Sequence, residues 1–121
     1  MLIDETYIKM AREAKEIQEG WEPKPGDKVY NNTFGFSHLP NEFVEDVIRD
    51  MYLWLPRQED LQTIYKQNKR VAYDGDVLLV FSSWVTGKLA HLDLDFNKMW
   101  LCFVMETCYH KHWDGKTWVV I

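Results

Sequence analysis

The densest group of candidate metal ligands in the sequence is Cys108, His110 and His112, with Cys102 a short way before them. Thiolate and imidazole are ligands that zinc prefers, and a structural zinc site needs four. On a helix only Cys108 and His112 would share a face, because side chains meet at spacings of three or four residues. Histidines near a helix C-terminus are explained by a favourable interaction with the helix dipole. We therefore expect neither a metal ion nor another cofactor.

A second group of residues could carry acid–base catalysis. Glu106 precedes His110 by four residues, and His91 stands close to Asp93 and Asp95. A carboxylate beside an imidazole can hold or transfer a proton. The same pattern also fits a helix N-cap at Asp93 or Asp95 and a surface pair of Glu106 with His110. We assign no catalytic residue, and a small enzyme or ligand-binding protein using His91, Glu106 or His110 is the alternative function.

The six tryptophans are the third feature with functional potential. Tryptophan is enriched at the centres of protein interfaces, so an exposed pair could form a docking patch. The pairs to consider are Trp54 with Trp84 and Trp113 with Trp118. A small domain can equally use these side chains to fill its core. The candidate interaction surface is Trp54, Trp84 and Trp113.

Several functional classes are disfavoured by composition and motifs. A net charge of -5 and a pI near 5.3 argue against a nucleic-acid groove, which needs an excess of Lys and Arg. The scattered glycines form no phosphate-binding loop, and the sequence has no nucleophile elbow.

The cysteines and the N-terminal sequence indicate a compartment. Cys102 and Cys108 are six residues apart, so on one helix their Cβ atoms would lie too far apart for a disulfide. Two free thiols suit a reducing compartment. The chain begins without a basic, apolar leader, and no segment approaches the roughly 20 apolar residues that span a bilayer. We expect a cytoplasmic protein.

The element that must organise the fold is a helix over residues 95–110. Between Met99 and Tyr109 only Glu106 and Thr107 are not apolar, so most of this helix must be covered by the rest of the chain. Its least apolar stripe is the one expected to face water: Asp95, Lys98, Cys102, Glu106 and Tyr109.

Three further helices are expected before it. Residues 4–19 carry an apolar stripe that favours packing within the domain, although its heptad-like spacing leaves open a homodimer through this first helix. That stripe comprises Ile3, Tyr7, Met10, Ala14, Ile17 and Trp21. Asp4 is the expected N-cap and Gly20 the expected stop. The second expected helix covers residues 40–52, and its inward side chains are Phe43, Val44, Val47, Ile48 and Met51. The third covers residues 56–67, and its inward side chains are Leu61, Ile64 and Tyr65.

Residues 71–89 are the ambiguous stretch. Asp74-Gly75 could form a hairpin turn, or residues 77–85 could form a buried helix that ends before Gly87; we favour the helix. Residues 28–30 and 118–121 are strands that we expect to pair with each other, and residues 31–39 are expected to be loop. The sequence thus predicts one α+β domain, residues 1–121, with four or five helices around the buried C-terminal helix and a small antiparallel sheet of two or three strands.

Three sequence blocks resemble small proteins carried by bacteriophages and prophages of Gram-positive bacteria. The first block is Trp21-Glu-Pro-Lys-Pro-Gly-Asp27, and the second is Trp54-Leu-Pro-Arg-Gln58 with Leu61 and Gln62. The third is Trp100-Leu-Cys-Phe-Val-Met105, continuing through Tyr109, Lys111 and Trp113-Asp-Gly-Lys-Thr-Trp-Val119. They cover about a third of the chain. The resemblance implies a phage or prophage origin and a cytoplasmic location in the host bacterium, and it assigns no activity. The leading expectation is a non-enzymatic accessory protein that binds a host or phage protein.

Overall fold

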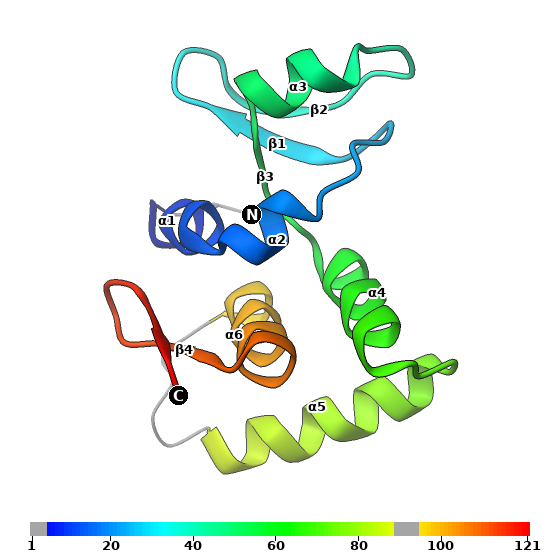
Figure 1. The fold of residues 1–121 in the computed structure, drawn as a ribbon, viewed down its shortest axis with the longest axis vertical. Coiled ribbons are helices and arrows are strands. Elements are labelled where there is room, and N and C mark those ends of the chain that lie inside the picture. Colours follow the sequence, from blue (N-terminus) through cyan, green and yellow to red (C-terminus); the bar gives the residue numbers. More distant parts are fainter. Residues whose placement is uncertain (1–4, 89–94) are drawn as a thin grey trace. The chain divides into compact units, whose positions relative to one another are not determined.

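The computed structural model describes residues 5–88 and 95–121, and it confirms the expected α+β class. The described residues form six helices, a three-stranded antiparallel sheet and a two-stranded sheet (Figure 1). The chain divides into two compact units, Met1–Pro56 and Arg57–Ile121. The sheet of three strands belongs to the first unit, and the buried helix belongs to the second. A single domain over residues 1–121 stays a prediction.

The first unit begins with two helices, α1 (Glu5–Glu13) and α2 (Lys15–Glu19), where one was expected. The backbone leaves the helical region at Ala14, whose ψ angle is 72°, and α2 ends as expected before Gly20. The expected stripe is buried: Tyr7, Met10, Ala14, Ile17 and Trp21 are each at most 3% exposed. This burial favours packing within the chain. Ile3 and Asp4 lie outside the described residues.

The three-stranded sheet has the order β2-β1-β3, with β1 (Lys28–Asn31) in the centre. Its neighbours are β2 (Gly35–His38) and β3 (Leu53–Trp54). The expectation of loop over residues 31–39 is therefore wrong. The side-chain oxygen of Asn31 accepts hydrogen bonds from the backbone N–H groups of Thr33 and Phe34, at 2.7 and 3.1 Å. Gly35 then takes a φ of +76°, and the chain turns back along β1.

The helix expected over residues 40–52 is shorter and less buried than predicted. It is α3 (Glu45–Met51), and of its expected inward residues only Ile48 is buried. Val44, Val47 and Met51 are 44–65% exposed. Seven residues make only two turns, so the helix is too short to bury five side chains in one row.

The second unit contains three helices, of which α6 (Phe96–Tyr109) is the core element. α4 (Gln58–Lys69) and α5 (Asp74–Lys88) both pack on it. The favoured helix in the ambiguous stretch is thus confirmed, although it continues past Gly87. Asp95 caps α6, since its carboxylate accepts a hydrogen bond from Lys98 N at 2.9 Å. Leu61 and Tyr65 are buried as predicted, and Ile64 is half-buried.

The expected water-facing stripe of α6 is only partly accessible. Lys98 and Cys102 are buried, at 8% and 4% exposed, whereas Asp95 is exposed. The long aliphatic stem of a lysine can be buried while its ammonium reaches a polar partner, here the Asp95 carboxylate at 3.8 Å. A free cysteine behaves as a small apolar residue. Helical spacing alone therefore overestimated how much of α6 faces water.

The C-terminal strands form a hairpin of their own, so the predicted pairing of residues 118–121 with the region of Val29 is wrong. β4 (Lys111–Trp113) pairs with β5 (Trp118–Val120). The central strand β1 already has β2 and β3 on its two edges. The turn lies at Asp114-Gly115: Gly115 has a φ of +102°, and the Asp114 carboxylate accepts from Lys116 N and Thr117 N, each at 2.8 Å.

Candidate interaction surface

A cluster of aromatic rings fixes α5 on α6. The ring of Phe81 stacks on Trp100 with centroids 3.8 Å apart and planes within 6°. Phe103 meets Phe81 and Trp84 edge-on, at 5.3 and 5.6 Å, and Tyr65 of α4 stacks on Phe103 at 4.9 Å. Aromatic pairs in these arrangements contribute beyond the area they bury. The inner face of α5 is therefore well anchored.

The outer face of the same helix presents apolar side chains to solvent. Among the α5 side chains that the structure describes, only those of Val77 and Phe81 are buried. Four apolar residues in and just before the first half of α5 are 44–73% exposed, and we call them the α5 patch: Tyr73, Leu78, Leu79 and Val80. A contiguous group of exposed apolar residues on one element is typical of a binding surface.

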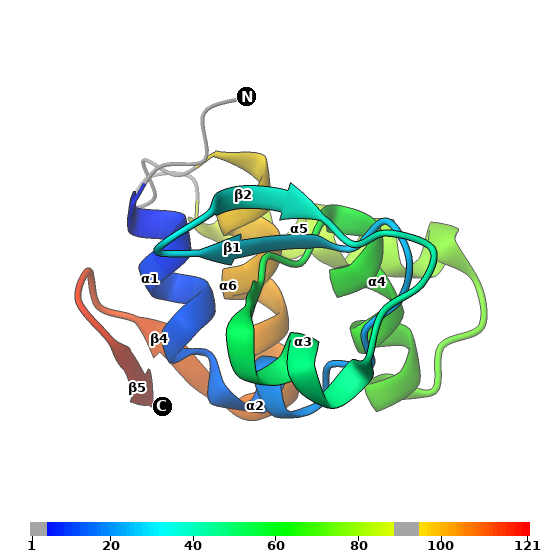
Figure 2. The same cartoon turned by 90° about the horizontal axis from the view of Figure 1, so that it is seen from above.

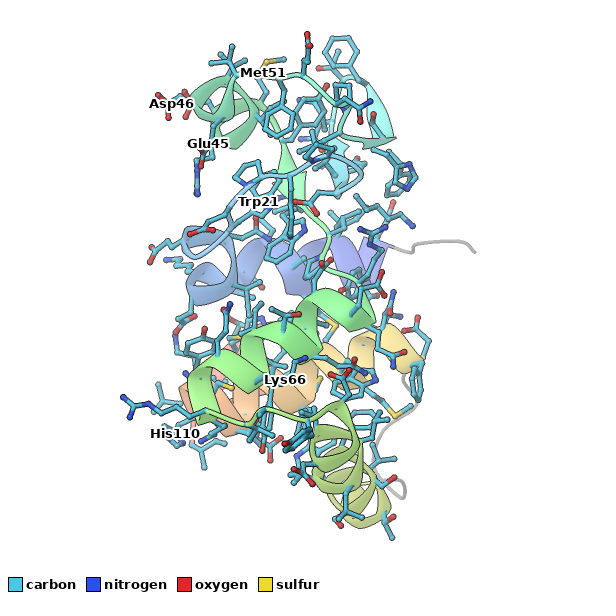
Figure 3. All side chains as sticks on the ribbon, turned by 90° about the vertical axis from the view of Figure 1, so that its right-hand side faces the viewer. Trp21, Glu45, Asp46, Met51, Lys66 and His110 are labelled. Carbon is cyan, nitrogen blue, oxygen red and sulfur yellow. The ribbon has the colours of Figure 1, made fainter. Side chains whose placement is uncertain are left out.

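The beginning of α5 is also held in place by charge. The Lys66 ammonium of α4, labelled in Figure 3, lies 2.7 Å from the Asp74 carboxylate at the first residue of α5. Asp74 and Asp76 both lie in the first turn, where the helix dipole favours negative charge. The α5 patch therefore lies on a helix that is fixed at its start and along its inner face.

The three tryptophans proposed from the sequence do not form one surface patch in either unit. Trp54 is 4% exposed and stacks on Trp21, with centroids 5.8 Å apart. Trp84 is half-buried in the aromatic cluster beside Phe81. Trp113 is half-buried and meets Trp118 across the hairpin at 5.1 Å. The core-filling alternative thus describes Trp54 fully and the other two in part.

The residues considered for acid–base chemistry are only partly described. His91 and Asp93 lie outside the described residues. Glu106 is half-buried on α6. His110 is exposed and is the first residue after the end of α6, with a left-handed φ of 56°. Figure 3 shows His110 beyond the end of that helix. The helical spacing that would have aligned Glu106 with His110 ends at Tyr109.

The cysteines lie in different environments. Cys102 is buried and Cys108 is half-buried, and both are free thiols. Burial raises the pKa of Cys108, an effect opposed in part by the Thr107 hydroxyl and by the positive charge of Lys69. The pKa of Tyr65 is also raised, first by burial and then by the nearby Cys108. Within the described residues, no three His, Cys, Asp or Glu side chains are grouped as metal ligands.

Two shallow hollows lie on the first unit, with volumes of about 410 and 390 Å³. They share Arg12, Tyr30 and Asn32, and neither is lined by Glu106 or His110. Their linings mix both signs of charge. Nothing in that mixture selects a ligand class.

The first of the three sequence blocks closes on itself through its two end residues. Trp21 Nε1 donates to the Asp27 carboxylate at 3.0 Å, and Lys24 N donates to the same oxygen at 3.0 Å. The second block supplies Trp54, which stacks on Trp21. The third supplies the fully buried Trp100, Leu101, Phe103 and Met105. Each of the three blocks therefore contributes residues to the core, whereas the end of the third block, residues 113–119, has no buried residue.

Comparison with known proteins gives no further guide. No protein family, no curated protein and no solved structure matches this chain. None of the helices described, over residues 5–88 and 95–121, combines the length and apolar character that crossing a bilayer requires. The α5 patch, which the sequence did not predict, is the candidate site with the most structural support, because its apolar side chains are exposed. Its signal in the sequence was the apolar run Val77–Phe81, which is longer than one buried helix face needs.

Proposed function

We propose that the protein is a non-enzymatic accessory protein of a phage or prophage, and that it binds a host or phage protein through the α5 patch in the cytoplasm of the host cell. The observation that carries this proposal is the exposure of Leu79, at 68%, on the outer side of a helix whose inner side is anchored by Val77 and Phe81. Leaving large apolar side chains in water has a free-energy cost, which burial in a partner removes.

The test is affinity capture from host lysate with a matched pair of variants. Leu79→Glu places a charge in the α5 patch, whereas Thr33→Glu places the same charge at an exposed position outside this helix, in the turn between β1 and β2. We expect one protein to be retained by the parent and by Thr33→Glu, and its affinity to fall about tenfold or more with Leu79→Glu. Circular dichroism checks that both variants are folded.

Two results would contradict the proposal. One is capture of no protein; the other is equal capture by Leu79→Glu. If a metabolite or metal ion instead co-purified in stoichiometric amount, the alternative function through His91, Glu106 or His110 would be favoured. The same mass-spectrometric measurement distinguishes these outcomes.

A further inference from the structure

The two edge strands of the three-stranded sheet differ in the hydrogen bonding of their outward backbone groups. At the β3 edge, Trp54 N donates to Gln18 Oε1 at 3.2 Å, and Gln18 Nε2 donates to Trp54 O at 2.8 Å. The side-chain amide of Gln18 thus takes the place of the next strand. Closing an edge in this way prevents it from pairing with another chain.

The other edge is β2, and its outward backbone groups can be identified from the register. Leu39 N donates to Asp27 O at 2.9 Å, and these two residues continue the register of β1 with β2. Residues facing each other in an antiparallel pair alternate between bonded and non-bonded positions. Gly35 and Ser37 therefore face β1, while the N–H and C=O groups of Phe36 and His38 point away from it.

The opposite side of β1 supports the same assignment. Lys28 O accepts from Leu55 N at 2.9 Å, so Lys28 faces β3 and Val29 faces β2. Val29 is the register partner of Ser37. Figure 2 shows β2 at the margin of the sheet, with β1 on one side of it.

β2 is short, but it carries none of the side chains that usually protect an edge strand. It contains no Lys, no Pro and no acidic residue, and the sequence from Asn31 to Asn41 carries no Asp, Glu, Lys or Arg. Among the described residues, the outward groups of Phe36 and His38 have one contact, a long bond of 3.4 Å from Ser37 Oγ to His38 O. A carbonyl has a second lone pair, so His38 O can still accept. Phe36 is 49% exposed beside this edge.

We propose that β2 pairs antiparallel with β2 of a second copy of this chain, about a two-fold axis at Ser37. In that register Phe36 of each copy lies opposite His38 of the other. The four outward groups of each strand are then all satisfied, by four hydrogen bonds between copies. Ser37 would face its own symmetry mate, and no like charges would meet. A two-fold interface is self-complementary, which is why this edge fits a second copy.

This pairing makes residue 37 a direct reporter of the interface. Because Ser37 is exposed and would lie at a non-hydrogen-bonded position between copies, like charges there would be only a few ångströms apart. Ser37→Lys alone and Ser37→Asp alone should each weaken the dimer about tenfold or more, and an equimolar mixture should restore it as a heterodimer. Thr33→Lys is the matched control, since Thr33 is exposed in the adjoining turn.

Sedimentation equilibrium measures the outcome. The parent and Thr33→Lys should rise with concentration from one chain of 14.5 kDa to twice that mass. A parent that stays monomeric from micromolar to millimolar concentration would overturn the proposal. So would a dimer that survives both single substitutions, because its interface would then lie elsewhere. Leu79→Glu should leave the dimer intact, which separates this interface from the α5 patch.

Discussion

The indole N–H of Trp21 donates to a carboxylate oxygen of Asp27 at 3.0 Å, although both residues are almost completely buried. The intervening Pro-Lys-Pro-Gly segment forms a loop, and Lys24 N donates to the same oxygen. Gly26, with a φ of +85°, lets the chain return toward Trp21. One carboxylate thus joins the end of α2 to the beginning of β1.

Removing this carboxylate should destabilise the protein. We expect Asp27→Ala to cost about 2–3 kcal/mol of unfolding free energy, because the buried indole N–H loses a charged acceptor. Asp27→Asn should cost less, since an amide oxygen can still accept. Lys24→Ala tests the ion pair alone and should cost under about 1 kcal/mol, because Lys24 is largely exposed. Urea unfolding followed by circular dichroism measures all three, and equal losses for Ala and Asn at position 27 would contradict the hydrogen-bond account.

The role of Gln18 can be tested at a single amide. Gln18→Leu keeps the approximate volume but removes both hydrogen bonds to Trp54, so the Trp54 N–H should exchange with solvent faster. The unfolding free energy should fall by about 2 kcal/mol, since two partly buried backbone groups lose their partners. Gln18→Glu keeps the acceptor and should preserve more of the protection. Hydrogen exchange measured by NMR decides the matter: unchanged protection of Trp54 in Gln18→Leu would show that something else closes the β3 edge.

The turn between β1 and β2 depends on a backbone conformation that favours glycine. Gly35 has a φ of +76°, and no atom lies near the position of an added Cβ, so strain in φ is the main cost of a substitution. We expect Gly35→Ala to lose about 1 kcal/mol, and Gly35→Asn less, because asparagine tolerates this region better. Thermal unfolding of the two variants provides the comparison. If the alanine variant were more stable than the asparagine variant, the left-handed conformation of residue 35 in this turn would be contradicted.

Stability should fall at alkaline pH because of Cys108. Its pKa is raised by burial in the folded protein, so the folded chain keeps the thiol proton longer than the unfolded chain does. The contribution of the neutral thiol to the unfolding free energy is complete below about pH 8.5, the ordinary pKa of an unfolded cysteine. It is lost as the pH rises above that value, because the unfolded chain then ionises more readily than the folded one. Tyr65, whose pKa is also raised, contributes in the same direction at higher pH. Unfolding titrations from pH 7 to about pH 10 should show a shallower decline for Cys108→Ala than for the parent; parallel curves would exclude a contribution from the thiol.

The sequence predicted the elements whose signal is periodic. The apolar run of α6 and the stripe that includes Met10 and Ile17 are buried as expected, because burial of such rows follows directly from helix geometry. β2 was missed because Phe36 is an isolated apolar residue among Gly, Ser and His, and its strand is specified by the turn at Asn31. The partner of Val119 was mispredicted because strand pairing depends on which edges are already occupied.

The candidate surface was the least predictable part. Tryptophan content suggested Trp54, but stacking on Trp21 uses that side chain in the core. The sequence predicts a buried helix around Leu79, because a short apolar run does not show how many sides of a helix are covered. That depends on the neighbours, and α5 packs through Val77 and Phe81 while Leu79 remains exposed.

The position of α6 in the chain has a consequence during synthesis. The ribosome makes α4 and α5 before α6, so Leu61, Val77 and Phe81 leave the exit tunnel without the surface that later buries them. The β1–β2 hairpin can form from residues close together in sequence, whereas the second unit must wait for Trp100 and Phe103. Nascent chains in that interval expose apolar side chains and are open to aggregation or chaperone binding. Synonymous codons that slow translation between α5 and α6 should therefore lower the yield of folded protein more than equal delays after Tyr109.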